Sequence, residues 1–199
     1  MITVLVMSVG AVALLMATSA KQASGVIPSK GLDPRLADLM NPGPEHQQIA
    51  KTVGTWDVDC SFWKGSNEAP IQSKGEIVYV PLFDGRFTQG TFTGMMMGQK
   101  FIGHSLMGYN RASKQYLSTW YDNMGTGITS LTGSSADNGK TITYSGEMTC
   151  PMNGKVQLRH VENHQSDASF TVTSYQIKDG KEQKTMELVH ARRQPAPNR

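Results

Sequence analysis

Between residues 54 and 192 the chain alternates apolar and polar side chains with a period of two, which is typical of β-strands with one buried face. Turn sequences such as Asp84-Gly85 and Asp179-Gly180 interrupt this alternation at short intervals. The interruptions predict ten strands, at residues 54–63, 74–83, 86–96, 99–109, 115–122, 127–134, 140–150, 155–163, 169–178 and 182–192.

A short helix precedes the strands. Pro44 at a first helical position, Glu45 in the first turn and Gly54 just beyond the end predict a helix over residues 44–52. Connections as short as those between the strands require antiparallel neighbours. Ten sequential antiparallel strands close most economically as one up-and-down barrel, because closure removes exposed strand edges. The expected fold is therefore all-β, a single antiparallel barrel of about ten strands whose N-terminal helix plugs one end.

The remaining segments divide the chain into parts. Residues 1–20 carry no charge and end in small residues, which predicts a signal peptide. Because no Lys or Arg precedes the apolar stretch, an uncleaved membrane anchor is the alternative. Residues 21–43 contain prolines and glycines and predict a linker with at most one helical turn near residues 36–40. The barrel domain is expected at residues 44–193 and a disordered tail at residues 194–199. The leader predicts a periplasmic or secreted protein.

The net charge and the distribution of charged residues limit which classes of partner are expected. The 199 residues have a formal net charge of +3, and the lysines and arginines are scattered among acids. No nucleic acid is expected as a partner, and a membrane only through an uncleaved leader. The sequence sets no oligomeric state.

The chain has two cysteines, Cys60 and Cys150. In an exported protein a bond between them would close a loop of roughly 90 residues and stabilise the fold by about 4 kcal/mol. On the first and seventh strands of an up-and-down barrel they would lie across the barrel, beyond the Cα separation of about 7 Å that a disulfide allows. Two free thiols are favoured, and the disulfide stays as the alternative.

The phase of the alternation predicts what faces inward. On the first strand Trp56 and Phe62 share the apolar face, which points into the barrel. Aromatic, methionine and polar side chains take the same phase on later strands, and this mixture is typical of a cavity lining. A small apolar molecule is the expected ligand. The side chains expected to bind it are Trp56, Phe62, Tyr116, Trp120, Asp122 and Met148.

Several blocks follow one another in a fixed order: Pro44-Glu45-His46-Gln47, Gly54-Thr55-Trp56-Asp57, Gly85-Arg86-Phe87 and the segments 97–103, 108–110 and 114–127. Together these blocks resemble one bacterial family, domain of unknown function 1579. The resemblance covers roughly residues 41–193 and implies a calycin-like barrel, as in lipocalins, fatty-acid-binding proteins and nitrobindin-like haem proteins. It implies no established chemistry.

Lipocalin-like barrels close their floor with an inward tryptophan that follows a helix-ending glycine, as in Gly54-Thr55-Trp56. Arg192, at the end of the last predicted strand, is expected to lie over the Trp56 ring and to seal this floor by a cation–π contact. We expect this pair to be structural.

Two alternatives to a binding module stay open. An inward His160 or His190 would be the axial ligand of a haem in a nitrobindin-like barrel, although no cofactor is otherwise predicted. An enzyme would use Asp122 and a histidine at the barrel mouth, unless Asp122 only accepts N–H bonds from its own loop. No catalytic residue is assigned.

No metal site is predicted, because the five histidines lack metal-ligand spacing. The run Met95-Met96-Met97 is expected to supply packing or portal residues at a hairpin tip.

Overall fold

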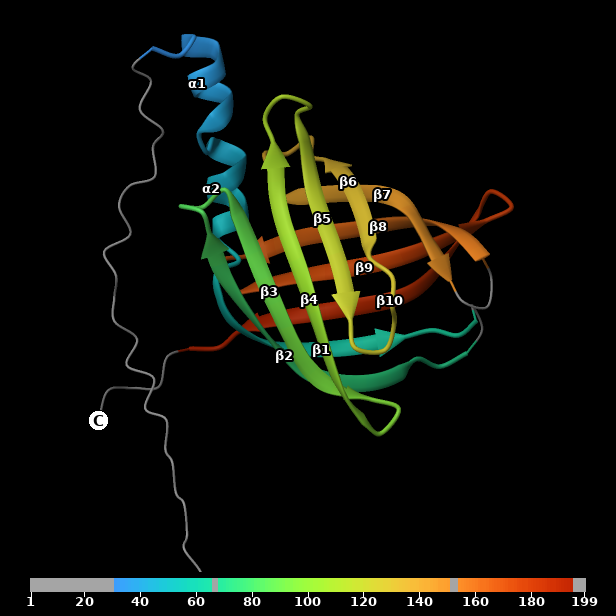
Figure 1. Ribbon diagram of the computed structural model, residues 1–199. Coiled ribbons are helices and arrows are strands. Elements are labelled where there is room, and N and C mark those ends of the chain that lie inside the picture. The colour runs from blue at the N-terminus through green and yellow to red at the C-terminus, as the bar shows by residue number, and fades with distance from the viewer. Residues whose placement is uncertain (1–30, 66–67, 151–153, 195–199) are drawn as a thin grey trace, which may run out of the picture.

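A computed structural model describes residues 31–65, 68–150 and 154–194; the predicted leader and most of the predicted tail lie outside these ranges. Ten antiparallel strands form one closed barrel, each strand pairing with its sequence neighbours (Figure 1). The prediction of a single up-and-down barrel is confirmed. The strands are β1 (Gly54–Phe62), β2 (Ile71–Leu82), β3 (Phe87–Met96), β4 (Gln99–Asn110), β5 (Gln115–Asp122), β6 (Thr129–Ser134), β7 (Thr141–Cys150), β8 (Gly154–Ser166), β9 (Ser169–Lys178) and β10 (Lys181–Arg192).

Two short helices stand at one end of the barrel, α1 (Pro34–Met40) and α2 (Pro44–Ala50) (Figure 1). Both begin with proline at a first helical position, where no N–H is needed. The helix expected over residues 44–52 is α2. The segment expected to hold at most one turn carries the seven-residue α1, because the Asp33 side chain accepts the Arg35 N–H at 2.8 Å and caps it.

Pairing of the first strand with the last closes the barrel. β1 and β10 run antiparallel, and their register places Trp56 opposite Arg192 and Val58 opposite His190. The inward face of β1 is the predicted one, since Trp56, Val58 and Cys60 are each at most 2% exposed. Period-two patterning thus set the correct phase of this strand.

Inward-facing glycines make room for aromatic rings in the barrel. A Cβ at Gly103 would lie 2.2 Å from the Trp120 ring, and a Cβ at Gly75 would lie 2.2 Å from the Phe92 ring. Phe92, Phe101 and Trp120 are mutual ring neighbours, with centroids 5.8 to 6.5 Å apart. The rings therefore occupy the space that side chains at the glycines would take.

Both cysteines are free thiols, Cys60 buried and Cys150 half-buried. This is the favoured expectation rather than the disulfide. In the described ranges, no helix is both long and apolar enough to pass through a bilayer.

Candidate functional site

The helix end of the barrel is closed by Trp56. Its indole Nε1 donates to the Thr52 carbonyl at 2.7 Å, and its side chain is 1% exposed. Gly54, two residues earlier, has a φ of +131°, and a Cβ there would lie 2.7 Å from Arg192 Nη1. Glycine is therefore required both by the backbone and by the approach of the guanidinium.

The expected cation–π contact is present. The Arg192 guanidinium carbon lies 4.1 Å from the Trp56 ring centroid. The same guanidinium donates to the carbonyls of Asp167 and Val53, each at 2.7 Å, and to that of Lys51. Arg192 thus ties β10 to the chain after α2 and to the turn between β8 and β9.

A buried aromatic and polar cluster lies beneath this closure. The Phe170 ring stacks on His190 with centroids 3.9 Å apart, and it also contacts His164 at 5.2 Å and Trp56 at 4.8 Å. His164 Nε2 is 2.7 Å from an oxygen of Glu162, whose side chain is only 9% exposed. A carboxylate inside an apolar barrel needs such a partner, so this pair fixes the His164 ring.

Three tyrosines enclose the same region. Burial raises the pKa of Tyr116 to about 12, and it raises the pKa values of Tyr79 and Tyr144 further. The negative charge of Glu162 contributes to the rise in all three. These hydroxyls therefore stay protonated at neutral pH and can donate hydrogen bonds inside the barrel.

The helix covers only part of this end, because α2 packs against β3 and β4. On the other side lies a cavity of about 300 Å³ whose wall includes Trp56 and His164, along with Lys51 and Lys140. A second cavity, of about 200 Å³, includes Tyr116 in its wall. The first cavity is lined mainly by polar surface and suits water or a small polar molecule, whereas polar and apolar surface line the second about equally.

We name the end of the barrel away from α2 the open end, because inward-facing side chains there are partly exposed to solvent. Six side chains there pack on the core yet stay partly exposed, although strand alternation directs them inward. They are Phe62, Met96, Trp120, Met148, Cys150 and Leu188. Solvent therefore reaches an apolar stretch of the barrel interior at this end.

The six residues expected to bind ligand are divided between the two ends. Phe62, Trp120 and Met148 lie at the open end, and Asp122 ends β5 there. Trp56 and Tyr116 lie at the helix end, where each lines a different cavity. The structure does not bring all six together.

Asp122 makes the turn contacts that were the alternative to a catalytic role. One carboxylate oxygen accepts the Trp120 Nε1–H at 2.8 Å, and the other accepts the backbone N–H of Met124 at 2.9 Å. In the described residues no hydrogen bond joins Asp122 to a histidine, and the nearby His104 projects from the other face of β4 toward Thr91 and Tyr121. The bonds of Asp122 are therefore those to Trp120 and to its own turn.

The two candidate haem ligands differ in their surroundings. His190 is 2% exposed, and its ring stacks on Phe170 and meets the Trp56 ring edge to face, so both rings occupy space beside it. His160 lies on the inward face of β8, where burial lowers its pKa to about 4. The pKa of His190 is lowered to about 4 by the same cause, so both rings are neutral at neutral pH. Over the described ranges, no three His, Cys, Asp or Glu side chains are grouped to hold a metal ion.

Sequence reasoning overlooked Glu162. An isolated glutamate on a strand is normally a surface residue, but Glu162 has the same strand parity as the buried Leu158. That parity was the available signal. The pairing with His164 depends on a two-residue spacing along one strand face, which is also readable from the sequence.

Solved structures resemble this barrel at low sequence identity. The crystal structure of Rv2717c from M. tuberculosis aligns with a TM-score of 0.54 and 15% identity, covering 77% of this chain and 100% of that one. The S-type phycobiliprotein lyase CPES from Guillardia theta aligns with a TM-score of 0.53 and 9% identity, covering 75% and 93%. These likenesses establish the fold alone. No curated protein matches the sequence.

The family profile of DUF1579, described as a protein of unknown function, matches residues 41–192. The matched region begins just before α2 and ends with β10, so it contains the whole barrel and the helix beside Trp56. This chain belongs to the DUF1579 family.

Proposed function

We propose that the protein binds a small, largely apolar molecule inside the barrel, through the end away from α2. The observation that carries this proposal is the set of inward-facing yet partly exposed apolar side chains at that end, including Phe62, Trp120 and Met148. An apolar ligand would cover this surface and remove it from water. Asp122 supports the site indirectly, because its bond to Nε1 holds the Trp120 ring.

The proposal includes export to the periplasm or the exterior, which rests on the apolar, uncharged residues 1–20. It assigns no catalytic role and requires no cofactor. The interior tyrosine hydroxyls near Glu162 would meet the polar end of a ligand that reached the helix side of the barrel.

Tryptophan fluorescence tests the proposal, because the chain has three tryptophans in different places. Trp120 lies at the open end, Trp56 is buried at the helix end, and Trp63 stands under the Lys184 ammonium, 4.4 Å from its ring centroid. Titration with palmitate or retinol should change the emission of the unaltered protein. Trp120→Phe should remove most of that change, whereas the matched control Trp63→Phe should keep it.

Binding itself is measured separately by native mass spectrometry of protein purified from its own host, which would retain the ligand mass. Met148→Lys places a charge in the apolar lining and should weaken palmitate binding at least tenfold. The proposed function would be refuted if neither palmitate nor retinol changed the tryptophan emission and native mass spectrometry found no bound ligand.

A further inference from the structure

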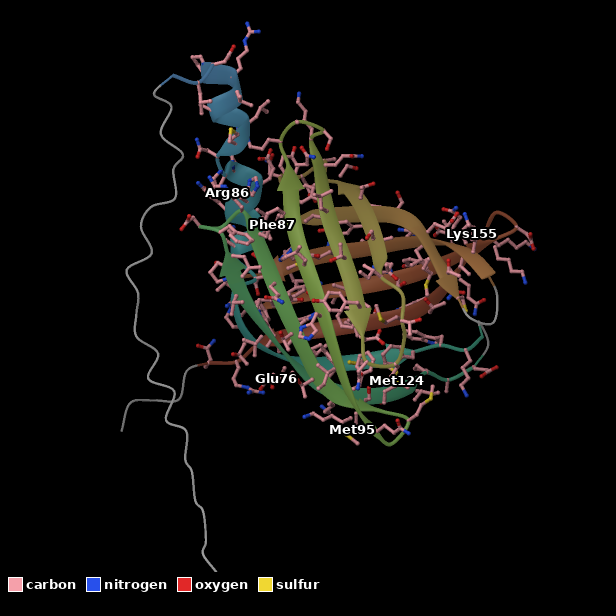
Figure 2. All side chains as sticks on the ribbon, in the orientation of Figure 1. Glu76, Arg86, Phe87, Met95, Met124 and Lys155 are labelled. Atoms are coloured by element: carbon pink, nitrogen blue, oxygen red, sulfur yellow. The ribbon has the colours of Figure 1, made fainter. Side chains whose placement is uncertain are left out.

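Large apolar side chains project into solvent from the loops and strand ends around the open end. We name five of them the Met–Ile rim: Ile71, Met95, Met97, Met124 and Ile128, which are 52%, 54%, 85%, 48% and 70% exposed. Single exposed apolar residues are common on protein surfaces, but a group of five on neighbouring loops and strand ends can form an interaction surface. Figure 2 shows Met95 and Met124 at the barrel end away from α2, with Arg86 and Phe87 at the helix end.

Hydrogen bonds hold the two main loops of the rim side by side. Asn123, in the loop after β5, donates through its side chain to the Lys100 carbonyl at 3.0 Å and accepts the Ile102 N–H at 2.9 Å. Lys100 is the second residue of β4, which begins directly after the turn that carries Met97. The Met124 loop is thus fixed against the Met97 hairpin, and Ile71 begins β2, the barrel neighbour of β3.

The most exposed member of the rim also occupies an unfavourable backbone position. Met97 and Gly98 form a two-residue hairpin turn in which both φ angles are positive, at 51° and 76°. Asparagine, aspartate or glycine is normally found at the first of these positions, since other side chains are strained there. Methionine at this turn therefore disfavours folding and leaves apolar surface in water.

The charges near the rim are mainly positive or already paired. Lys64 and Lys100 are exposed and make no ion pair with another described side chain, and Lys74 pairs with Asp59 at 2.8 Å. Both oxygens of the Asp122 carboxylate are occupied by Trp120 and Met124. Glu68, in the loop between β1 and β2, and Asp179, in the turn between β9 and β10, are exposed acids at the same end of the barrel.

We propose that the Met–Ile rim docks the open end of the barrel onto a lipid bilayer with anionic headgroups. The rim side chains would enter the interface between headgroups and acyl chains, and the flanking lysines would meet the negative surface. This goes beyond the proposed function but rests partly on it, because an apolar ligand held at the open end would pass directly from bilayer to barrel. It differs from the expectation that only an uncleaved leader contacts a membrane.

The test uses vesicles of phosphatidylcholine with and without phosphatidylglycerol, and variants of the full chain, so that any leader contributes equally. Met97→Asn together with Ile128→Ser should weaken vesicle binding by at least tenfold, since each exposed side chain would otherwise be removed from water. Asparagine suits the positive φ, so the variant should fold at least as well as the unaltered chain. The matched control is Phe83→Asn, because Phe83 is also 68% exposed with a φ of 49°, but lies in the turn between β2 and β3 at the helix end.

A local readout separates rim docking from anchoring by the leader. In Met97→Trp the new indole should be quenched by brominated acyl chains, whereas the new indole of Phe83→Trp should not. The proposal would be overturned if brominated acyl chains quenched the two new indoles equally. It would also be overturned if the Met97→Asn, Ile128→Ser variant bound vesicles as the unaltered chain does and the indole of Met97→Trp were not quenched. A dimer in sedimentation equilibrium that this variant abolishes would overturn it too, because the rim would then face a second copy.

Solution binding of palmitate distinguishes this inference from the proposed function. The Met97→Asn, Ile128→Ser variant should bind palmitate in the absence of vesicles as the unaltered protein does. If the protein does not bind palmitate but binds vesicles through the rim, the ligand proposal alone is refuted. If it binds palmitate but its vesicle binding does not depend on the rim, the docking proposal alone is refuted.

Discussion

Removal of the Arg192 side chain should strongly destabilise the barrel. Its guanidinium donates to three carbonyls, those of Asp167, Val53 and Lys51, and lies 4.1 Å from the Trp56 ring centroid. Hydrogen bonds to a charged group contribute roughly 1.5 to 3 kcal/mol each, and an exposed cation–π contact roughly 0.5 to 1 kcal/mol. Because the side chain is partly exposed, water can replace some of these bonds, so Arg192→Ala should lower the free energy of unfolding by about 3 kcal/mol.

The neighbouring arginine supplies the control. Arg193 forms ion pairs with both Asp57 and Glu76, whereas Arg192 forms none with a described acid. Counting ion pairs would therefore make Arg193 the more important residue. We expect the opposite, because exposed ion pairs are weakened by solvent while Arg192 joins three backbone segments.

Urea unfolding followed by tryptophan fluorescence measures both variants. Arg193→Ala should cost less than half of what Arg192→Ala costs. Arg192→Lys should recover less than half of the lost free energy of unfolding, since one ammonium cannot replace the several N–H donors of the planar guanidinium. An equal or larger loss in Arg193→Ala would refute this account of how the barrel is closed.

Three further outcomes are expected. Gly103→Ala should cost about 1 to 3 kcal/mol by overpacking, since its Cβ would lie 2.2 Å from the Trp120 ring, and an unchanged melting temperature would contradict the packing. Burial lowers the pKa values of His160 and His190 to about 4 in the folded state, below the ordinary value of about 6.5 in the unfolded chain. Between these two pH values the unfolded chain binds more protons, so the free energy of unfolding should be highest above about pH 6.5 and should fall as the pH drops toward 4. At pH 5 the loss should be about 2 kcal/mol per histidine in urea titrations, and the His160→Gln, His190→Gln double variant should show a much flatter profile. The buried Cys60 thiol, whose pKa is raised by burial, should resist a disulfide reagent until the protein unfolds, and rapid labelling of the native state would show that solvent reaches it.

Local patterning was sufficient to predict most of the barrel. Alternation gave ten strands and the inward phase of β1, and the helix-ending Gly54 before Trp56 indicated the closed end. The β2 and β8 strands begin or end several residues beyond their predicted limits, at Ile71 and Ser166. The cross-strand partner supplies those hydrogen bonds, and polarity along one strand does not record them.

The candidate site was harder to predict, because strand parity gives the face of a side chain but not its height along the barrel. Trp56, Ile77, Phe92, Gly103 and Asp122 are successive partners across five neighbouring strands. This row starts at the closed end and finishes at the open end, since barrel strands tilt relative to the axis. Residues that share parity were therefore expected in one cavity, although the stagger separates them.

Pairing of β1 with β10 has a consequence for synthesis of the chain. The strand partner of Trp56 is Arg192, 136 residues later, so the ribosome must release all ten strands before the barrel can close. Contacts between such distant segments form slowly, and until then β1 and β9 each present an unpaired edge. A message truncated before Lys181 would yield a polypeptide that exposes both edges permanently and is prone to aggregate.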